Sequence, residues 1–136
     1  MSSFPEHFEL KFPLATIALD GDIVTISMHK GEKITLEAVK EMYRISNEEL
    51  KGKRVAVMLD ATQTPLISYP ESVLKYAADN EYSHNEAAYA ILIDGVGQKM
   101  MAGFYLSLNK PKTPTRVFTD RTEAISWLKE MLSVNH

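Results

Sequence analysis

Acidic and hydroxyl side chains follow three apolar segments of the sequence, and these residue types suit the binding of a ligand or a partner. The groups come after residues 54–59, 88–93 and 115–118. In open α/β sheets, ligands bind at the carboxyl ends of the strands, beside the N-termini of the following helices. The alternative is that each residue only caps a helix or turns the chain. The candidate residues of this edge are Asp60, Thr62, Thr64, Ser68, Asp94, Gly95, Gly97, Thr119 and Asp120.

Motifs for other chemistries are incomplete. Residues 94–99 place two glycines before a lysine, but they lack the spacing of a P-loop and the Ser or Thr that follows its lysine. No histidine has a partner three or four residues away that would form a metal pair, and His84 is interpreted as a solvated loop residue. We therefore predict no catalytic residue, cofactor or metal, and a protein that is not an enzyme. An enzyme would require His84 or the carboxylates of Asp60, Asp94 and Asp120 to converge on a cleft.

Length and composition favour one folded domain over residues 1–136, with residues 1–7 as a short flexible arm. The chain has 136 residues, of which 45% are hydrophobic and 24% charged, with a net charge of -3 and no cysteine. The lack of cysteine excludes disulfides and thiol catalysis and suits the cytoplasm. The basic cluster at 51–54 is too short for nucleic-acid binding. No apolar run reaches the roughly 20 residues of a membrane span.

The hydrophobic pattern predicts strands that alternate with helices. An extended segment at 8–12 precedes a hairpin, whose strands 14–19 and 23–28 flank the Asp20-Gly21-Asp22 turn. Continuous apolar runs at 54–59 and 88–93 indicate strands that are buried on both faces. A further short strand is predicted at 115–118, and helices are predicted at 36–50, from 70, at 98–108 and from 121. The predicted caps are Thr35 for the first helix, Ser68 with Glu71 for the second and Thr119-Asp120 for the last. The order β-β-β-α-β-α-β-α-β-α predicts a mixed α/β sheet, mostly parallel with an N-terminal antiparallel hairpin.

The predicted helix at 98–108 carries more apolar residues than one sheet face can cover. Five of them share a broad arc, and Leu106 lies on the opposite side. We interpret the surplus as a homodimer interface or an adaptable apolar groove, since methionines repack easily. The alternative is that the N-terminal arm covers it with Phe4 and Phe8. The five residues are Met100, Met101, Phe104, Tyr105 and Leu108.

Residues 20–132 resemble the SpoIIAA-like proteins, the α/β fold of anti-sigma-factor antagonists (STAS domains), and within them small bacterial STAS/SEC14-like proteins of unknown function. The resemblance rests on Pro114-Thr115-Arg116-Val117-Phe118-Thr119-Asp120 followed by Glu123-Ala124-Ile125-Ser126-Trp127-Leu128. The strand at 88–94 and the helix at 100–108 add to it. The resemblance implies a SpoIIAA-like fold.

The function implied by this resemblance is regulatory. Anti-sigma-factor antagonists carry a phosphorylated serine in a pattern of Asp-Leu-Ser and then Asp-Ser-Ser-Gly. Asp60 and Thr62 can be matched to its first part, the second part is absent, and Ser68 lies near the analogous place. The resemblance therefore implies a regulatory or protein-interaction domain without a clear phosphoswitch motif, with a regulatory protein as partner. The alternative is a SEC14-like binder of a lipid or another small apolar ligand.

Overall fold

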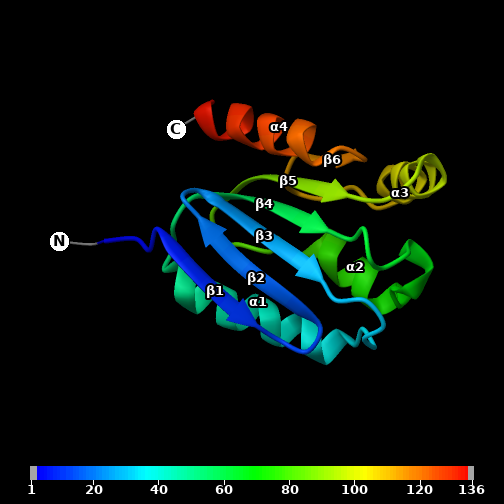
Figure 1. Ribbon diagram of the computed structural model, residues 1–136, viewed down its shortest axis with the longest axis horizontal. Helices are drawn as coiled ribbons and strands as arrows, with labels where there is room; N and C mark the ends of the chain where they lie inside the picture. The colour runs from blue at the N-terminus through cyan, green and yellow to red at the C-terminus, as the bar shows by residue number, and fades with distance from the viewer. Residues whose placement is uncertain (1–2, 135–136) are drawn as a thin grey trace.

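A six-stranded mixed sheet forms the centre of the protein in a computed structural model, which describes residues 3–134 (Figure 1). The strands follow one another in space in the order of the sequence. The first three pair antiparallel and the last four pair parallel, as the sequence predicted. The strands are β1 (His7–Lys11), β2 (Ala15–Asp20), β3 (Ile23–Met28), β4 (Val55–Asp60), β5 (Glu86–Leu92) and β6 (Thr115–Phe118).

Helices cover both faces of this sheet. Right-handed connections between neighbouring parallel strands place their helices on one face. Accordingly, α1 (Leu36–Leu50) and α2 (Glu71–Asp79) lie below the sheet in Figure 1, and α3 (Val96–Leu108) lies beyond the arrowheads of β5 and β6. The last helix, α4 (Arg121–Ser133), lies alone on the opposite face. The predicted element order is confirmed, with a short 3-10 helix, η1 (Leu66–Ser68), added before α2.

Strand β4 contributes to the core on both faces, as its continuous apolar run predicted. Val55 and Val57 pack in the cluster with α1, while Ala56 and Met58 pack in the cluster with α4. On β5, the alternate residues that face α4 are Ala88, Ala90 and Leu92, and they are buried. The small alanines allow α4 to approach the sheet closely, and its Leu128 is fully buried there.

Two of the predicted helix caps are confirmed, and the third is wrong. Thr35 Oγ1 accepts the Ala38 N–H at 3.2 Å, and Asp120 Oδ1 accepts the Glu123 N–H at 3.1 Å. The predicted capping box of Ser68 and Glu71 does not form, because Ser68 ends η1 and α2 begins only at Glu71.

The predicted N-terminal arm is paired near its end. His7 belongs to β1, and the Glu6 carbonyl accepts the Gly21 N–H at 2.9 Å. Met1 and Ser2 of the arm, and the C-terminal His136, lie outside the described residues.

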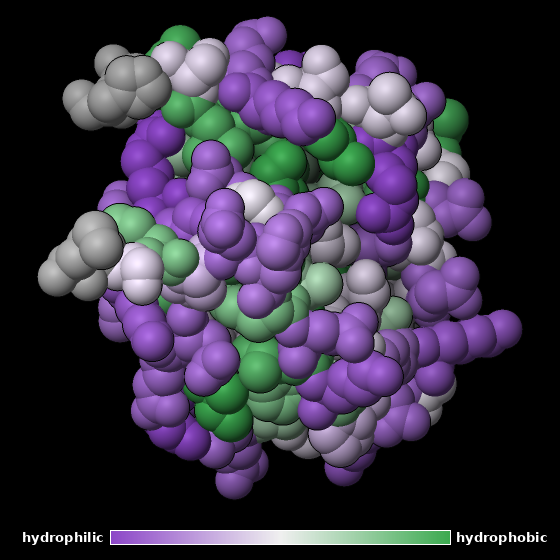
Figure 2. Space-filling view, turned by 60° about the vertical axis from the view of Figure 1, so that its left-hand side comes forward, coloured by the Kyte–Doolittle hydropathy of each residue, from purple (hydrophilic) through white to green (hydrophobic). Residues whose placement is uncertain are grey.

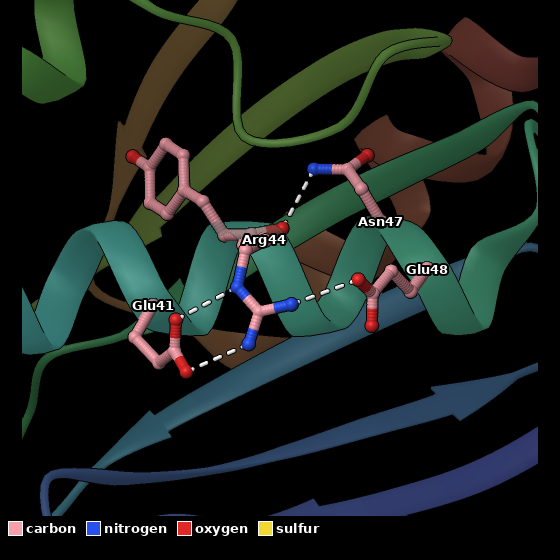
Figure 3. Close-up of polar contacts among 5 residues, drawn as sticks. Glu41, Arg44, Asn47 and Glu48 are labelled. Carbon is pink, nitrogen blue, oxygen red and sulfur yellow. Dashed lines mark hydrogen bonds and ion pairs between the residues drawn. The ribbon is translucent and has the colours of Figure 1, made fainter.

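Asn47 joins α1 to the loop that precedes β5, although the helical pattern places it on the polar face. Its Nδ2 donates to the Tyr43 and Tyr82 carbonyls at 2.8 Å each, and its Oδ1 accepts the His84 N–H at 3.0 Å. Figure 3 shows Asn47 beside Arg44, which pairs with the exposed Glu41 and Glu48. Exposed ion pairs of this kind contribute little to stability. Asn47 is therefore the stronger link.

Replacing Asn47 with alanine should lower the free energy of unfolding by about 1–3 kcal/mol, because the Tyr82 carbonyl and the His84 N–H lose their side-chain partner. Urea unfolding followed by circular dichroism measures this change. The control Arg44→Ala removes only exposed pairs and should cost less than about 1 kcal/mol. Equal effects of the two variants would contradict the linking role of Asn47.

Candidate functional site

An apolar cavity lies between α2, α3 and the face of β4 and β5 that α4 does not cover. Its volume is about 130 Å³. On this face α2 packs against α1, and α3 packs against β6 and η1, and the cavity lies between the two helices over Tyr89 and Ile91 of β5. Apolar side chains line most of it, including Leu59, Ala61, Val73, Leu74, Ala78, Ile91, Ile93, Ala102 and Leu106.

One end of the cavity is acidic. Glu86 at the start of β5, Glu81 in the loop after α2 and the buried Thr113 all line it. Thr113 Oγ1 donates to Glu81 Oε2 at 2.5 Å, and the Ser83 N–H donates to Glu86 Oε1 at 3.2 Å. Burial raises the pKa of Glu86 to about 7, the charge of Glu81 adds to the rise, and the bonds from Thr113 and Ser83 oppose it. Glu86 is thus divided between its two protonation states near neutral pH.

Tyrosines surround the same space. Tyr43 and Tyr82 meet edge to face with ring centroids 5.0 Å apart, and Thr64 Oγ1 bonds the Tyr69 hydroxyl at 2.8 Å. Burial raises the pKa of Tyr43, Tyr69, Tyr82 and Tyr89, so their hydroxyls stay neutral. The Tyr82 hydroxyl is buried together with the Ser46 hydroxyl, which partly opposes the rise of the Tyr82 pKa. These rings add apolar area and a few polar tips to the cavity wall.

The three loops of the predicted binding edge do meet at the carboxyl ends of the parallel strands. The Ala61 N–H donates to the Leu92 carbonyl, and the Ile93 N–H donates to the Phe118 carbonyl, both at 2.9 Å. Asp60 Oδ1 accepts the Thr62 N–H at 3.0 Å and its hydroxyl at 2.6 Å, while Oδ2 pairs with Arg121. Asp60 therefore joins its own loop to the first residue of α4.

The remaining residues of this edge differ in accessibility. Thr64 is buried and turned towards Tyr69, whereas Ser68 is exposed at the end of η1. Asp94 and Thr119 are exposed. Gly95 has a φ of 91° before α3, Gly97 lies in its first turn, and Asp120 caps α4. Of the three hydroxyl residues that follow β4, Thr62, Thr64 and Ser68, only Ser68 is exposed.

Helix α3 divides its apolar residues between the cavity and the surface. Tyr105 lines the cavity, as does Leu106, while Met100, Phe104 and Leu108 are 71%, 69% and 67% exposed and Met101 is 46% exposed. The alternative that the N-terminal arm covers them is wrong. Phe4 is itself 51% exposed, and β1 lies at the opposite edge of the sheet from β6. On the face near the two termini, by contrast, hydrophilic side chains form most of the surface, with apolar areas between them (Figure 2).

Sequence reasoning missed the acidic end of the cavity. Glu81, Glu86 and Thr113 come from two loops and a strand, and no spacing rule joins them. The one available signal is a glutamate at the start of an otherwise apolar strand. Arg121 was missed for the same reason, since its partner Asp60 is 61 residues away. Residues 3–134 contain no cluster of three His, Asp or Glu side chains that could hold a metal ion.

The pH dependence of stability should report the buried Glu86. Its pKa rises from an ordinary 4.5 to about 7 on folding, so the folded state holds this proton more tightly than the unfolded chain. The resulting stabilisation, of at most about 3 kcal/mol, is complete below pH ~4.5 and is lost as the pH rises to about 7. Urea unfolding between pH 5 and pH 8 should show this loss in the wild type and not in Glu86→Gln. The exposed Glu49→Gln is the control and should behave as the wild type; a loss that persists in Glu86→Gln would exclude Glu86 as its source.

Known proteins support the fold. The chain is similar to a crystal structure described as an uncharacterised protein of the DUF3478 family with a SpoIIAA-like fold, from Shewanella loihica PV-4. The two share 17% sequence identity, with 94% of this chain and 98% of that chain covered and a TM-score of 0.51. The SpoIIAA-like fold expected from the sequence is thus confirmed. No curated protein matches the chain.

No helix within residues 3–134 has both the length and the apolar character to cross a membrane. The model of one protein family, described as a domain of unknown function, matches residues 17–132, which is most of the chain. The chain therefore belongs to this family, DUF7793.

Proposed function

We propose that this domain binds a small apolar ligand in the cavity between α2, α3 and the sheet. The observation that carries the proposal is the cavity itself, whose wall is almost wholly apolar. Its volume of about 130 Å³ is close to the roughly 150 Å³ of engineered apolar cavities that bind a single aromatic ring. The ligand is then one ring or a short chain. Of the two functions that the sequence suggested, apolar ligand binding has the more specific structural support.

The position of the cavity also supports ligand binding. A well-packed domain leaves few voids larger than a water molecule, because unfilled space forfeits packing energy. Here the void is lined by large side chains such as Tyr89 and Ile91, which pack in clusters with Val73 of α2 and Ala102 of α3 and still leave the space unfilled. A ligand between α2 and α3 would fill the space and add packing contacts to these side chains.

Filling the cavity should abolish binding. Ala78 lies on α2 and lines the cavity, so Ala78→Phe places a ring in the space proposed for the ligand. We expect the neutral single-ring dye 4-(dimethylamino)benzonitrile to bind the wild type with changed fluorescence and to lose at least about tenfold in affinity with Ala78→Phe.

The matched control is Ala18→Phe, which adds the same ring on β2, away from the cavity lining. This variant should bind the dye as the wild type does. Equal dye binding by all three proteins would overturn the proposal. Native mass spectrometry of the purified wild type gives a second measure through a co-purified small molecule.

A regulatory interaction domain is the second candidate, and the exposed apolar surface of α3 favours it. Met100, Phe104 and Leu108 recur at four-residue spacing, and each is more than two-thirds exposed. Monomeric proteins rarely leave a continuous apolar strip uncovered, so a second copy of the chain would bury it. The exposed Ile67 and Ser68 of η1 lie beside α3 and offer a partner protein further contact area.

Self-association through α3 is tested by light scattering after size exclusion. The wild type is expected to run as a dimer at tens of micromolar, and Phe104→Glu as a monomer, since a charge in an apolar interface is left without a partner. The control Ser72→Glu adds the same charge at an exposed position on α2 and should leave the dimer intact. A monomeric wild type, or a dimeric Phe104→Glu, would contradict this role of α3.

A further inference from the structure

The two carboxyl groups at the acidic end of the cavity have no cation within ion-pair distance among residues 3–134, although the exposed Glu81 also borders a second, polar pocket lined by Lys40, Arg44, His84 and Lys112. Glu81 and Glu86 line this end together. The groups that act on the pKa of Glu86 are Thr113, Ser83, the Tyr82 backbone and Glu81, and none is a cation. Glu86 acts in turn on the buried hydroxyls of three tyrosines, Tyr43, Tyr82 and Tyr89.

The hydrogen-bond capacity of the two carboxyl groups is also unfilled. Each ionised carboxylate offers about four lone-pair sites. The Thr113 hydroxyl, which has one proton, donates to Glu81 and also lies beside Glu86, and Glu86 faces the backbone N–H groups of Ser83 and Tyr82. The lone-pair sites of the part-buried Glu86 therefore still exceed its protein donors, whereas the exposed Glu81 is also open to water.

The remaining wall next to this end is aromatic. Tyr43, Tyr82 and Tyr89 line the cavity there, with Tyr43 and Tyr82 packed edge to face. Aromatic faces attract cations, and the attraction grows when water is excluded. The ring faces and the carboxylates thus both favour a positively charged group at this end of the cavity.

We propose that the ligand is an apolar amine, whose ammonium group lies between Glu81 and Glu86 and whose apolar part lies over Tyr89 and Ile91. This inference rests on the proposed ligand-binding function and adds the charge of the ligand to it. An ammonium group supplies three donors and the missing positive charge. An apolar carboxylic acid, such as a fatty acid, would instead place a third carboxylate beside the first two and be repelled.

Three six-carbon probes that share a chain and differ in their polar group test the inference: hexylamine, 1-hexanol and hexanoate. By isothermal titration calorimetry at pH 8, hexylamine should bind at least about tenfold more tightly than hexanoate, because one charge-assisted hydrogen bond contributes at least that much affinity. Glu86→Gln should weaken hexylamine binding by about tenfold and change 1-hexanol binding little. Glu81→Gln should act in the same direction, and Glu49→Gln should have no effect.

The pH dependence separates the ammonium site from general apolar binding. Hexylamine stays protonated below pH ~10, as lysine does, so its affinity should follow the ionisation of Glu86 and rise by about tenfold between pH 6 and pH 8. The affinity for 1-hexanol should not rise in this range, and Glu86→Gln should abolish the rise for hexylamine.

The outcomes distinguish the two proposals. If none of the three probes binds at millimolar concentration, the proposed ligand-binding function fails. If hexanoate binds as tightly as hexylamine, or if Glu86→Gln and Glu81→Gln leave hexylamine binding unchanged, the cavity binds ligands and the inferred amine site is wrong. The unfolding curve of each variant shows that it is folded before it is titrated.

Discussion

The cavity follows from one constraint, the right-handed connection between parallel strands that neighbour each other in both sequence and space. With strands β3 to β6 in sequential order, this connection sends the linking helices to the same side of the sheet. Only α4, which does not link two of these strands, occupies the other face. Three helices share the first face, and α1 and α2 pack together there. Since α3 packs against β6 and η1, the cavity remains between α2, α3 and the middle of β5 on that side.

The residues of β5 match this unequal covering. On the α4 side the strand carries two alanines and a leucine, all buried, and the helix lies close against them. On the other side it carries Tyr89 and Ile91, which are large and line the cavity. Small residues permit close helix packing, while large ones build a wall around a space that no helix fills. One strand thus contributes to a filled core on one face and to the wall of an apolar cavity on the other.

The carboxylates of β4 and β5 also differ, since one is paired within the protein and the other is not. The carboxylate at the end of β4, Asp60, is joined to Thr62 and Arg121 and ties the loop to α4. The carboxylate at the start of β5, Glu86, has no cation and lies in the cavity wall. A buried carboxyl group without a positive partner costs free energy in its ionised form, which explains its raised pKa. Asp60 is therefore already paired within the protein, whereas Glu86 is available to a ligand in the cavity.

The sequence by itself determined the elements and their order. Alternation of apolar residues defined the hairpin, continuous runs defined the buried strands, and Thr35 and Asp120 marked two helix starts, because each of these signals acts over a few neighbouring residues. It also indicated that α3 has more apolar surface than a sheet can cover. Only the tertiary structure decided which of those residues face the cavity and which face solvent, and it replaced the Ser68 cap with a 3-10 turn.

The proximity of Glu81, Glu86 and Thr113, and the bonds from Asn47 to a loop 35 residues away, were also decided by the fold alone. Local patterns report how a segment buries its own side chains. They carry no information on which distant segment comes to lie beside it, because that depends on how helices of given length pack across the sheet.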